Sequence, residues 1–444
     1  MQPVRTLILG AAGKDFHLFN TLYRDEPQVG VVAFTAQQIP HIDERSYPPT
    51  LAGDQYPDGI PIHPEEDLVE LIRELEVDRC VMGYSDVSHE YVMHLAAKVT
   101  AAGASFEIPD ARRTMLASRK PSVAVCASRT GVGKSQTTRA VARHLTSRGM
   151  RVAVLRHPMP YGDLAAQAVQ RFAEYEDLAR HRVTIEEREE YEPHIDMGTL
   201  LFAGVDYEAI LREAEKEADV ILWDGGNNDT SFVAPDLYLT LVDPHRPGHE
   251  ERYYPGETNV LLADAVLINK VATARPEDVA QVRRNVQRMN PEATILEAAS
   301  PLFLDDPGVL KGRRVLAIED GPTLTHGGMA YGAGTLGAMK AGAAEIVDPR
   351  EFAVGEIAET FQKYPDIGAL LPAMGYGDQQ IRDLGETIRN AAAAGVEAVA
   401  VGTPIDLARI VEIPLPHTRV RYELQVLGSP TLEEVIDEAL GLAG

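Results

Sequence analysis

One segment limits the possible folds more than any other: an apolar run at 122–127 leads through a glycine-containing turn into a polar stretch with helical periodicity. The letters from 122 to 145 are SVAVCASRTGVGKSQTTRAVARHL. A strand, a glycine turn and a helix in this order are typical of P-loop NTPases, in which backbone N–H groups and the helix N-terminus face the phosphates of a nucleotide. We therefore expect an enzyme that transfers a phosphoryl group from ATP or GTP.

The turn departs from the common pattern GxxxxGK[ST], because Ser128 stands where the first glycine is expected. The variant KGGxGK[ST] fits better, with Arg129 in place of its first lysine. In that class the basic residue contacts the phosphates, often across a dimer interface, so a homodimer is expected. Lys134 is expected to reach the β- and γ-phosphates as a catalytic residue, and Ser135 to bind Mg²⁺ through its hydroxyl. The predicted nucleotide-binding residues of the loop are Arg129, Thr130, Gly131, Val132, Gly133, Lys134, Ser135 and Gln136.

Two later strand ends carry residues that are typical of nucleotide sites. Asp224, in DVILWDGGNND, ends an apolar run and is predicted to be the catalytic Walker B carboxylate that organises Mg²⁺. Asn269 and Lys270 resemble the start of the guanine-reading motif NKxD and are predicted to contact the nucleotide, but Ala272 replaces the aspartate of that motif. Loss of this carboxylate favours ATP over GTP. The alternative for the pair is a helix-capping Asn beside a solvated Lys.

Strand-type apolar runs alternate with helix-period segments along nearly the whole chain, which predicts an α/β fold with mainly parallel sheets. Three domains are expected: a Rossmann-like domain at 1–117, a P-loop NTPase domain at 118–312 and a C-terminal α/β domain at 313–444. The expected helices include 136–148, 207–218 and 276–289. The expected buried strands lie at 6–10, 29–34, 79–84, 122–127, 151–156, 219–225, 237–243, 265–270, 293–298 and 313–319.

The formal net charge of −25 bears on the partners of this chain. A chain this acidic is not expected to bind nucleic acid or an anionic membrane through a broad basic surface. An anionic substrate must then be held by local groups of basic side chains. The two cysteines, Cys80 and Cys126, lie in apolar runs and read as buried thiols. No apolar run approaches the length of a membrane span and no signal peptide is seen, so a cytoplasmic protein is expected.

The segment DPHRPGHE, at 243–250, is the main candidate for holding an anionic substrate. It follows the strand that comes directly after the Asp224 strand, so it is expected near the nucleotide. Arg246 can clamp a phosphate with two hydrogen bonds, while His245 and His249 can donate hydrogen bonds or move protons. All three are predicted to be catalytic, and Arg246 and His249 also to bind the substrate. A solvated turn without function is the alternative.

Other polar residues follow strands or turns near the expected site. Asp163 is a further candidate Mg²⁺ ligand. The acidic stretch EEREEYEPHI (186–195) has two interpretations that both stay open. It could bind a metal or transfer protons, or it could be a solvated charged helix. The turns GAAG (10–13) and THGG (325–328) each fit either an anion site or close backbone packing. The remaining predicted substrate-binding residues are Asp15, His17, Arg156, His157, His194 and His326.

Several strings resemble the cyclic 2,3-diphosphoglycerate synthetases, which belong to the SIMIBI class of P-loop proteins. DPHRPGHE together with YEPHI points to this family, and the resemblance covers essentially the whole chain. The strings are GAAGKDFHLFN (10–20), YSDVSHEYVMH (84–94), SRTGVGKSQTTR (128–139), RHPMPYGDL (156–164), EEREEYEPHI (186–195), WDGGNND (223–229), DPHRPGHE (243–250) and THGGMAYGAG (325–334).

The resemblance implies a ligase that uses ATP to cyclise 2,3-diphosphoglycerate, with release of ADP and phosphate. Its cofactors would be ATP and Mg²⁺, with K⁺ as a further candidate, and its partner would be this small anionic substrate. Two other functions stay open at this point. One is a SIMIBI-type GTPase or ATPase with a regulatory or chaperone role, and the other is a kinase that acts on another small anionic substrate. The sequence contains no CxxC motif, which disfavours a metallochaperone.

Overall fold

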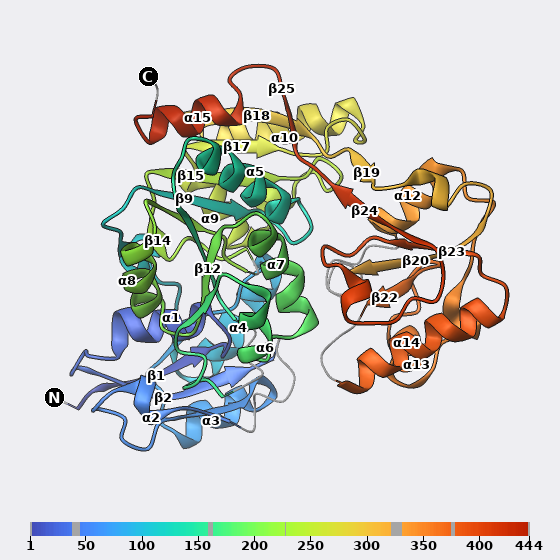
Figure 1. Ribbon diagram of the computed structural model, residues 1–444. Helices are drawn as coiled ribbons and strands as arrows, with labels where there is room; N and C mark the ends of the chain where they lie inside the picture. The colour runs from blue at the N-terminus through green and yellow to red at the C-terminus, as the bar shows by residue number, and fades with distance from the viewer. Residues whose placement is uncertain are drawn as a thin grey trace. The chain divides into compact units, whose positions relative to one another are not determined.

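The computed structural model describes residues 2–37, 45–158, 163–226, 228–320, 331–373 and 378–442. Figure 1 traces the chain from its N-terminus in blue to its C-terminus in red. The chain divides into two compact units. The first contains residues 1–173, 199–298 and 426–444, and the second contains residues 174–198 and 299–425.

The first sheet of the first unit, drawn in blue to cyan in Figure 1, is mainly parallel. Its strand order is β3 (Ser46–Tyr47), β4 (Ile60–Pro64), β2 (Val29–Ala36), β1 (Val4–Leu9), β5 (Arg79–Met82) and β7 (Ser105–Glu107). β1 pairs in parallel with β2 and β5, whereas β3 is antiparallel to β4. The helices of this region are α1 (Lys14–Leu18), α2 (Pro49–Ala52), α3 (Leu68–Glu74) and α4 (His89–Ala102).

The central sheet of the first unit carries the glycine-containing turn. Its order is β11 (Gln170–Phe172), β12 (Leu200–Ala203), β10 (Val152–Arg156), β13 (Val220–Trp223), β9 (Ser122–Ala127), β15 (Leu237–Val242), β17 (Ala265–Ile268), β18 (Thr294–Ala299) and β25 (Gln425–Leu427). β9 pairs in parallel with β13 and β15 and is buried over its whole length, as expected for a strand covered on both faces. The helices that accompany this sheet are α5 (Lys134–Ser147), α8 (Tyr207–Glu217), α9 (Gly256–Leu262), α10 (Pro276–Met289) and α15 (Leu432–Ala439).

Helix α8 shows why these segments fold onto the sheet. Its apolar residues Tyr207, Ile210, Leu211 and Ala214 recur at helical spacing and are all buried. They belong to the same core cluster as Trp223 of β13. Complete burial of a large apolar side chain contributes about 1.5–3 kcal/mol, so this face alone fixes the helix on the sheet.

Two short ladders join loops of the first sheet to loops of the central sheet. β6 (Val87–Ser88), which follows β5, pairs antiparallel with β16 (Tyr253–Tyr254), which follows the 243–250 segment. β8 (Leu116–Ala117) pairs in parallel with β14 (Val233–Ala234), which follows β13. The carboxyl end of β5 is thereby brought beside the carboxyl ends of β9, β13 and β15.

The second unit contains a smaller, mixed sheet. Its order is β19 (Leu302–Leu304), β24 (His417–Tyr422), β23 (Ala398–Val401), β20 (Arg314–Asp320) and β21 (Glu345–Ile346), and β22 (Leu371–Ala373) also pairs with β20. The buried side chain of Glu319 accepts hydrogen bonds from the backbone N–H groups of Gly334 and Thr335 and so caps a helix. The helices of this unit are α6 (Tyr175–Arg180), α7 (Ile185–Asp196), α12 (Ala333–Ala341), α13 (Gly355–Lys363) and α14 (Asp378–Ala393).

The predicted α/β class with mainly parallel sheets is confirmed, and all ten expected strands are found with ends that differ by a few residues. The three predicted domain ranges stay predictions. The two compact units follow other limits, because residues 426–444 cluster with the first unit and residues 174–198 with the second. Within the described part of the chain, no helix has the length and apolar character needed to cross a membrane.

Candidate active site

The turn between β9 and α5 has the backbone of a phosphate-binding loop. Gly131 and Gly133 have φ angles of +80° and +107°, which side-chain-bearing residues rarely adopt. A Cβ on Gly133 would lie 2.1 Å from Asn269 Nδ2 and 2.5 Å from Gln136 Nε2. Glycine is therefore required here by backbone conformation and by space. Helix α5 begins at Lys134, so its N-terminus faces the turn.

Asp224 directly follows β13 and joins two cations in the interior. It is fully buried, and its Oδ1 accepts a hydrogen bond from Lys134 Nζ at 2.5 Å. Arg156, at the end of β10, donates to Oδ2 of the same carboxylate. A buried carboxylate needs such partners, since breaking a buried pair costs on the order of 3–5 kcal/mol. Three residues predicted from separate strings therefore lie together at the carboxyl ends of neighbouring strands.

Three side chains support the loop from the carbonyl side. They donate to its backbone oxygens: Asn269 to Val132 at 2.8 Å, Lys270 to Gly131 at 2.6 Å and Arg246 to Thr130 at 2.7 Å. Asp243 holds two of these donors, accepting from Lys270 Nζ at 2.8 Å and lying 3.5 Å from Arg246 NH2. Burial opposes the ionisation of Asp243, but Lys270 and Arg246 outweigh it and hold the pKa of this carboxyl below its ordinary value.

Asp86, in the loop between β5 and β6, was missed by the sequence analysis. Its Oδ2 accepts hydrogen bonds from the Thr130 hydroxyl at 2.6 Å and from the Thr130 backbone N–H at 3.2 Å. Its Oδ1 accepts from Arg129 Nε at 2.6 Å. The only sequence signal was its place in YSDVSHE, one of the strings that carried the family resemblance. The first sheet therefore contributes directly to the nucleotide loop.

The basic residue of the variant loop is held on several sides. The Arg129 guanidinium lies 3.6 Å from the centre of the Tyr253 ring, and its NH1 lies 2.9 Å from His249 Nδ1. Burial, helped by the charges of Arg129 and Arg246, lowers the pKa of His249. His245 of the same segment is exposed and bonds Thr273 Oγ1 at 2.9 Å. Within the 243–250 segment, His249 and Arg246 therefore face the loop, whereas His245 does not contact it.

A second group of polar side chains comes from segments that follow β1 and β5 of the first sheet and β10 and β13 of the central sheet. Asp15 and Asp229 are both buried, and burial raises the pKa of Asp15 to about 7 and also raises the pKa of Asp229. Ser85 Oγ donates to Asp229 Oδ1, and His157 Nε2 lies 3.8 Å from Asp229 Oδ2. Asp229 and His157 both feel the charge of Lys134. Asp229 and His157 therefore lie near the lysine expected at the γ-phosphate.

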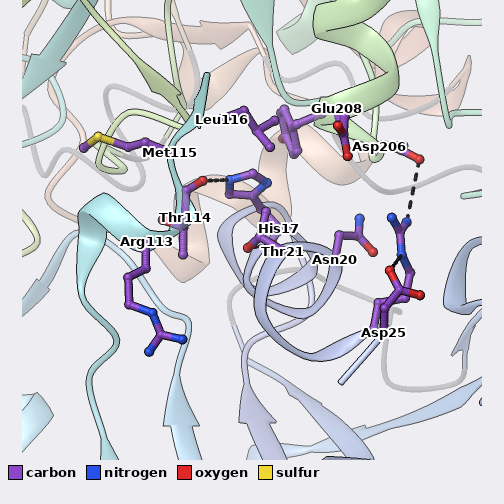
Figure 2. A pocket seen from close by; sticks show the side chains of 12 residues that line it. His17, Asn20, Thr21, Asp25, Arg113, Thr114, Met115, Leu116, Asp206 and Glu208 are labelled. Atoms are coloured by element: carbon purple, nitrogen blue, oxygen red, sulfur yellow. Dashed lines mark hydrogen bonds and ion pairs between the residues drawn. The ribbon is translucent and has the colours of Figure 1, made fainter. Parts of the chain in front are cut away.

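His17 lies on the same short helix as Asp15 but does not join this group. Its Nε2 is 2.6 Å from the carbonyl oxygen of Thr114, and its ring stacks on Phe232 with centroids 4.1 Å apart. Burial lowers its pKa to about 4. His17 lines a separate pocket of about 270 Å³ together with Asn20, Thr114 and Asp206. Figure 2 shows these side chains around the pocket.

The remaining predicted residues lie elsewhere. Asp163 accepts hydrogen bonds from the backbone N–H groups of Ala165 and Ala166, at 2.9 and 3.4 Å, and is exposed. His194 is buried in α7 of the second unit. His326, with the rest of THGG, lies outside the described residues. The roles predicted for these three residues stay predictions.

A Mg²⁺ site formed by the protein alone is not seen in the described ranges, where no group of three or more His, Cys, Asp and Glu side chains gathers. Mg²⁺ beside a nucleotide takes only one or two protein oxygens, however, and completes its shell with phosphates and water. The Ser135 hydroxyl, in the first turn of α5, and the Asp224 carboxylate, directly after β13, are hard oxygen donors. These two residues fit the ion.

Comparison with known proteins gives one full-length relative. The arginine synthetase ArcE of Thermococcus kodakarensis is 58% identical over 434 residues, which cover 98% of this chain and 96% of that protein. No protein-family model matches the chain.

Solved structures show looser likenesses. LpxK from Aquifex aeolicus, in complex with ATP, aligns over 73% of this chain and 90% of its own with a TM-score of 0.45 and 13% identity. The hydrogenase maturation factor HypB from Archaeoglobus fulgidus aligns over 40% and 80% with a TM-score of 0.26 and 14% identity. At these TM-scores the likenesses say nothing about activity.

Proposed function

The chain belongs to the family of the Thermococcus kodakarensis arginine synthetase ArcE, and we propose that it too forms arginine, at the expense of a nucleoside triphosphate. The observation that carries this proposal is the 58% identity over 98% of the chain. The nucleotide-binding loop of this same chain supplies the expected energy source. We take the nucleotide to be ATP, because Ala272 stands where guanine-reading proteins have an aspartate.

This relationship overturns the expected cyclisation of 2,3-diphosphoglycerate. The string resemblance gave the wrong reaction, since the full-length relative is an arginine synthetase. The strings that misled are rich in residues that handle phosphate, and Arg246, Lys270 and Asp243 are bound around the nucleotide loop itself. Residues with that task are shared by enzymes with different acceptors, so they identify the donor and leave the acceptor open.

The chemistry of arginine indicates which acceptor is needed. Its guanidinium group differs from a ureido group by one nitrogen in place of the carbonyl oxygen. Oxygen leaves readily once it has been converted to a phosphate ester, and a P-loop enzyme can make that ester by transferring the γ-phosphoryl group. A nitrogen nucleophile then adds to the carbon, and phosphate departs. The acceptor in this proposal is therefore citrulline, the ureido counterpart of arginine.

The nitrogen source that fits this chain best is ammonium. Enzymes that take nitrogen from glutamine commonly use a reactive cysteine thiolate. Cys80 and Cys126 are the two cysteines of the sequence, both are buried, and burial raises the pKa of each thiol to about 12. Neither thiol is available as a nucleophile at neutral pH. Ammonium used directly requires no such group.

The residues near the loop take the following roles in this proposal. Lys134 withdraws from Asp224 to the β- and γ-phosphates and stabilises the charge that develops during transfer. Ser135 and Asp224 would hold Mg²⁺, which would supply positive charge against the phosphates. Arg156 keeps Asp224 ionised after Lys134 has moved, because it bonds the other carboxylate oxygen.

The test is to incubate the purified chain with citrulline, isotopically labelled ammonium, ATP and Mg²⁺. Labelled arginine, ADP and phosphate should appear in equal amounts. Amino-acid analysis measures the arginine, and phosphorus NMR measures the ADP and phosphate. Lys134→Ala should abolish all three, because it removes several kcal/mol of transition-state stabilisation. The exposed Lys216, whose side chain is 64% accessible, gives the matched control Lys216→Ala with normal turnover. Formation of ADP and phosphate without arginine would overturn the proposal.

A further inference from the structure

Three hydrogen-bond acceptors lie at strand ends near the nucleotide loop, and within the described part of the chain no hydrogen bond joins them. Asp229 uses Oδ1 to accept from Ser85, while its Oδ2 faces His157 Nε2 at 3.8 Å, which is too long for a hydrogen bond. His157 Nδ1 lies 3.3 Å from the carbonyl oxygen of Pro158, which can only accept. The ring proton is therefore on Nδ1, and Nε2 presents a lone pair to a carboxylate.

The third acceptor is the Asp15 carboxyl group. Its Oδ1 accepts from the backbone N–H groups of Ala12 and Phe16, at 2.6 and 2.8 Å, and none of the described residues donates a hydrogen bond to its Oδ2. Two glycines leave the space that this side chain occupies. A Cβ on Gly10 would lie 2.4 Å from Asp15 Oδ2, and one on Gly83 would lie 2.8 Å from Asp15 Cβ. Strand ends from two places in the first sheet thus make room for a buried carboxyl group.

The charges around these acceptors leave them short of a cation. Asp15 and Asp229 are close enough for their charges to repel, which adds to the effect of burial on Asp15. Lys14 is near both, but its Nζ is taken by the Tyr254 hydroxyl at 2.9 Å and lies over that ring at 4.2 Å. A buried carboxylate without a bonded cation is costly. A Cβ on Gly13 would lie 3.4 Å from His157 Cγ, so the His157 ring packs on the turn that precedes Asp15. A small cation with several N–H donors would suit the acceptors gathered around this turn.

Building on the proposed function, we propose that Asp15, Asp229 and His157 bind the ammonium ion that supplies the new nitrogen of arginine, and that Asp15 removes its proton. The Asp15 carboxylate takes H⁺ from NH₄⁺ and leaves NH₃. The nitrogen lone pair then forms a C–N bond to the phosphorylated ureido carbon. The C–O bond breaks, the proton lost by the added nitrogen leaves with phosphate as HPO₄²⁻, and Asp15 returns its own proton to solvent.

The acceptor set favours ammonium over a monovalent metal ion. Hard cations such as K⁺ are bound by oxygen atoms, whereas an imidazole lone pair is a poor ligand for them. An N–H donor can bond both a carboxylate oxygen and the lone pair of a neutral imidazole nitrogen. The position also suits the reaction, because Asp229 and His157 feel the charge of Lys134, the residue expected at the transferred phosphoryl group.

The test compares two nitrogen nucleophiles in the full chain with citrulline, ATP and Mg²⁺. Ammonium must lose a proton before it can attack, whereas hydroxylamine is largely unprotonated at neutral pH. Asp15→Asn should lower kcat/KM for ammonium by about 100-fold or more, on the scale of a lost general base. The same variant should turn over hydroxylamine, with N-hydroxyarginine as product, within a few-fold of wild type. Asp25→Asn, whose exposed side chain lies on the segment after the same helix, is the matched control.

Each outcome decides the inference. Unchanged ammonium kinetics in Asp15→Asn would overturn it, and so would an equal loss with both nucleophiles, because that pattern reports damage to phosphoryl transfer. If Asp15→Asn does not fold, Asp229→Asn carries the test, with a raised KM for ammonium and a normal KM for ATP expected. A wild-type chain that makes no arginine from citrulline and either nucleophile would instead overturn the proposed function, and this inference with it.

Discussion

Asp86 of the first sheet holds Thr130 of the nucleotide loop through two hydrogen bonds, one to the hydroxyl at 2.6 Å and one to the backbone N–H at 3.2 Å. The same carboxylate accepts from Arg129, the basic residue of the variant loop. The loop conformation therefore depends on a residue that precedes it by more than forty positions. A movement of the first sheet against the central sheet would therefore change the conformation of the phosphate-binding loop.

We predict that Asp86→Ala weakens ATP use. The change leaves three donors on Arg129 and Thr130 without their acceptor, and a hydrogen bond to a charged group contributes about 1.5–3 kcal/mol. A loss of roughly 10- to 100-fold in kcat/KM for ATP is expected, measured by steady-state kinetics with citrulline and ammonium saturating. Asp58→Ala removes an exposed carboxylate from the turn before β4 of the first sheet and serves as the control. Equal ATP kinetics in both variants would contradict the role of Asp86.

Arg246 is predicted to matter more for ATP than for the acceptor. The sequence alone placed it at the substrate, but its NH2 donates to the carbonyl oxygen of Thr130 at 2.7 Å. Arg246→Ala should raise the KM for ATP about 10-fold, the equivalent of one charge-assisted hydrogen bond, and change the KM for citrulline little. Arg275→Ala, at a side chain that is 71% exposed, is the control. A raised KM for citrulline with an unchanged KM for ATP would contradict this prediction and would show that Arg246 acts on the acceptor.

The local part of this site could be predicted from the sequence, because a strand, a glycine turn and a helix are adjacent in the chain. The apolar runs likewise marked the ten strands, since a strand buried on both faces needs a nearly continuous apolar sequence. The partners of the loop could not be predicted in this way. Asp86 reaches Thr130 only because β6 pairs with β16, and residues 87 and 254 carry no sign of that pairing.

The acceptor chemistry was beyond the sequence for a different reason. In the sequence, Asp15 is notable only because it follows the GAAG turn closely, and Asp229 only because it ends the string WDGGNND. Neither pattern predicts that the two carboxyl groups lie close enough to repel, because the residues are more than two hundred positions apart and follow strands of different sheets. Local sequence patterns predict the fold and the nucleotide that donates the phosphoryl group. The acceptor site, in contrast, is formed by residues that only tertiary contacts bring together.

ATP is predicted to be used at least as well as GTP. Asn269 and Lys270 are occupied with the backbone oxygens of Val132 and Gly131, and Ala272 offers no carboxylate to the guanine N1 and N2 groups. The measurement is kcat/KM for the two nucleotides under the same conditions. Ala272→Asp, which restores the motif, should shift the ratio towards GTP. A strong preference of the wild-type chain for GTP, about 100-fold, would contradict this reading.

The last prediction concerns Asp15 and the pH dependence of stability. Burial raises the pKa of this carboxyl from 3.8 to about 7 in the folded chain, whereas the unfolded chain keeps an ordinary carboxyl. Between these pH values Asp15 keeps its proton in the folded state but loses it in the unfolded state. The free energy of unfolding therefore falls as the pH rises from about 4 to about 7. Above pH 7 both states are ionised, and the penalty stays constant at up to about 4 kcal/mol.

Asp15→Asn removes this titration and nearly keeps the shape of the side chain. In ammonium-free buffer, the free energy of unfolding of the variant minus that of wild type should therefore rise from about pH 4 to about pH 7 and then level off. Chemical denaturation at a series of pH values measures this difference, with Asp25→Asn as the control because its side chain is 86% exposed. A difference that does not change with pH would mean that the Asp15 carboxyl titrates normally. A base that waits for a cationic substrate is expected to destabilise the fold while it is ionised and unpaired. Added ammonium should therefore raise the free energy of unfolding of the wild type at neutral pH, but not that of Asp15→Asn.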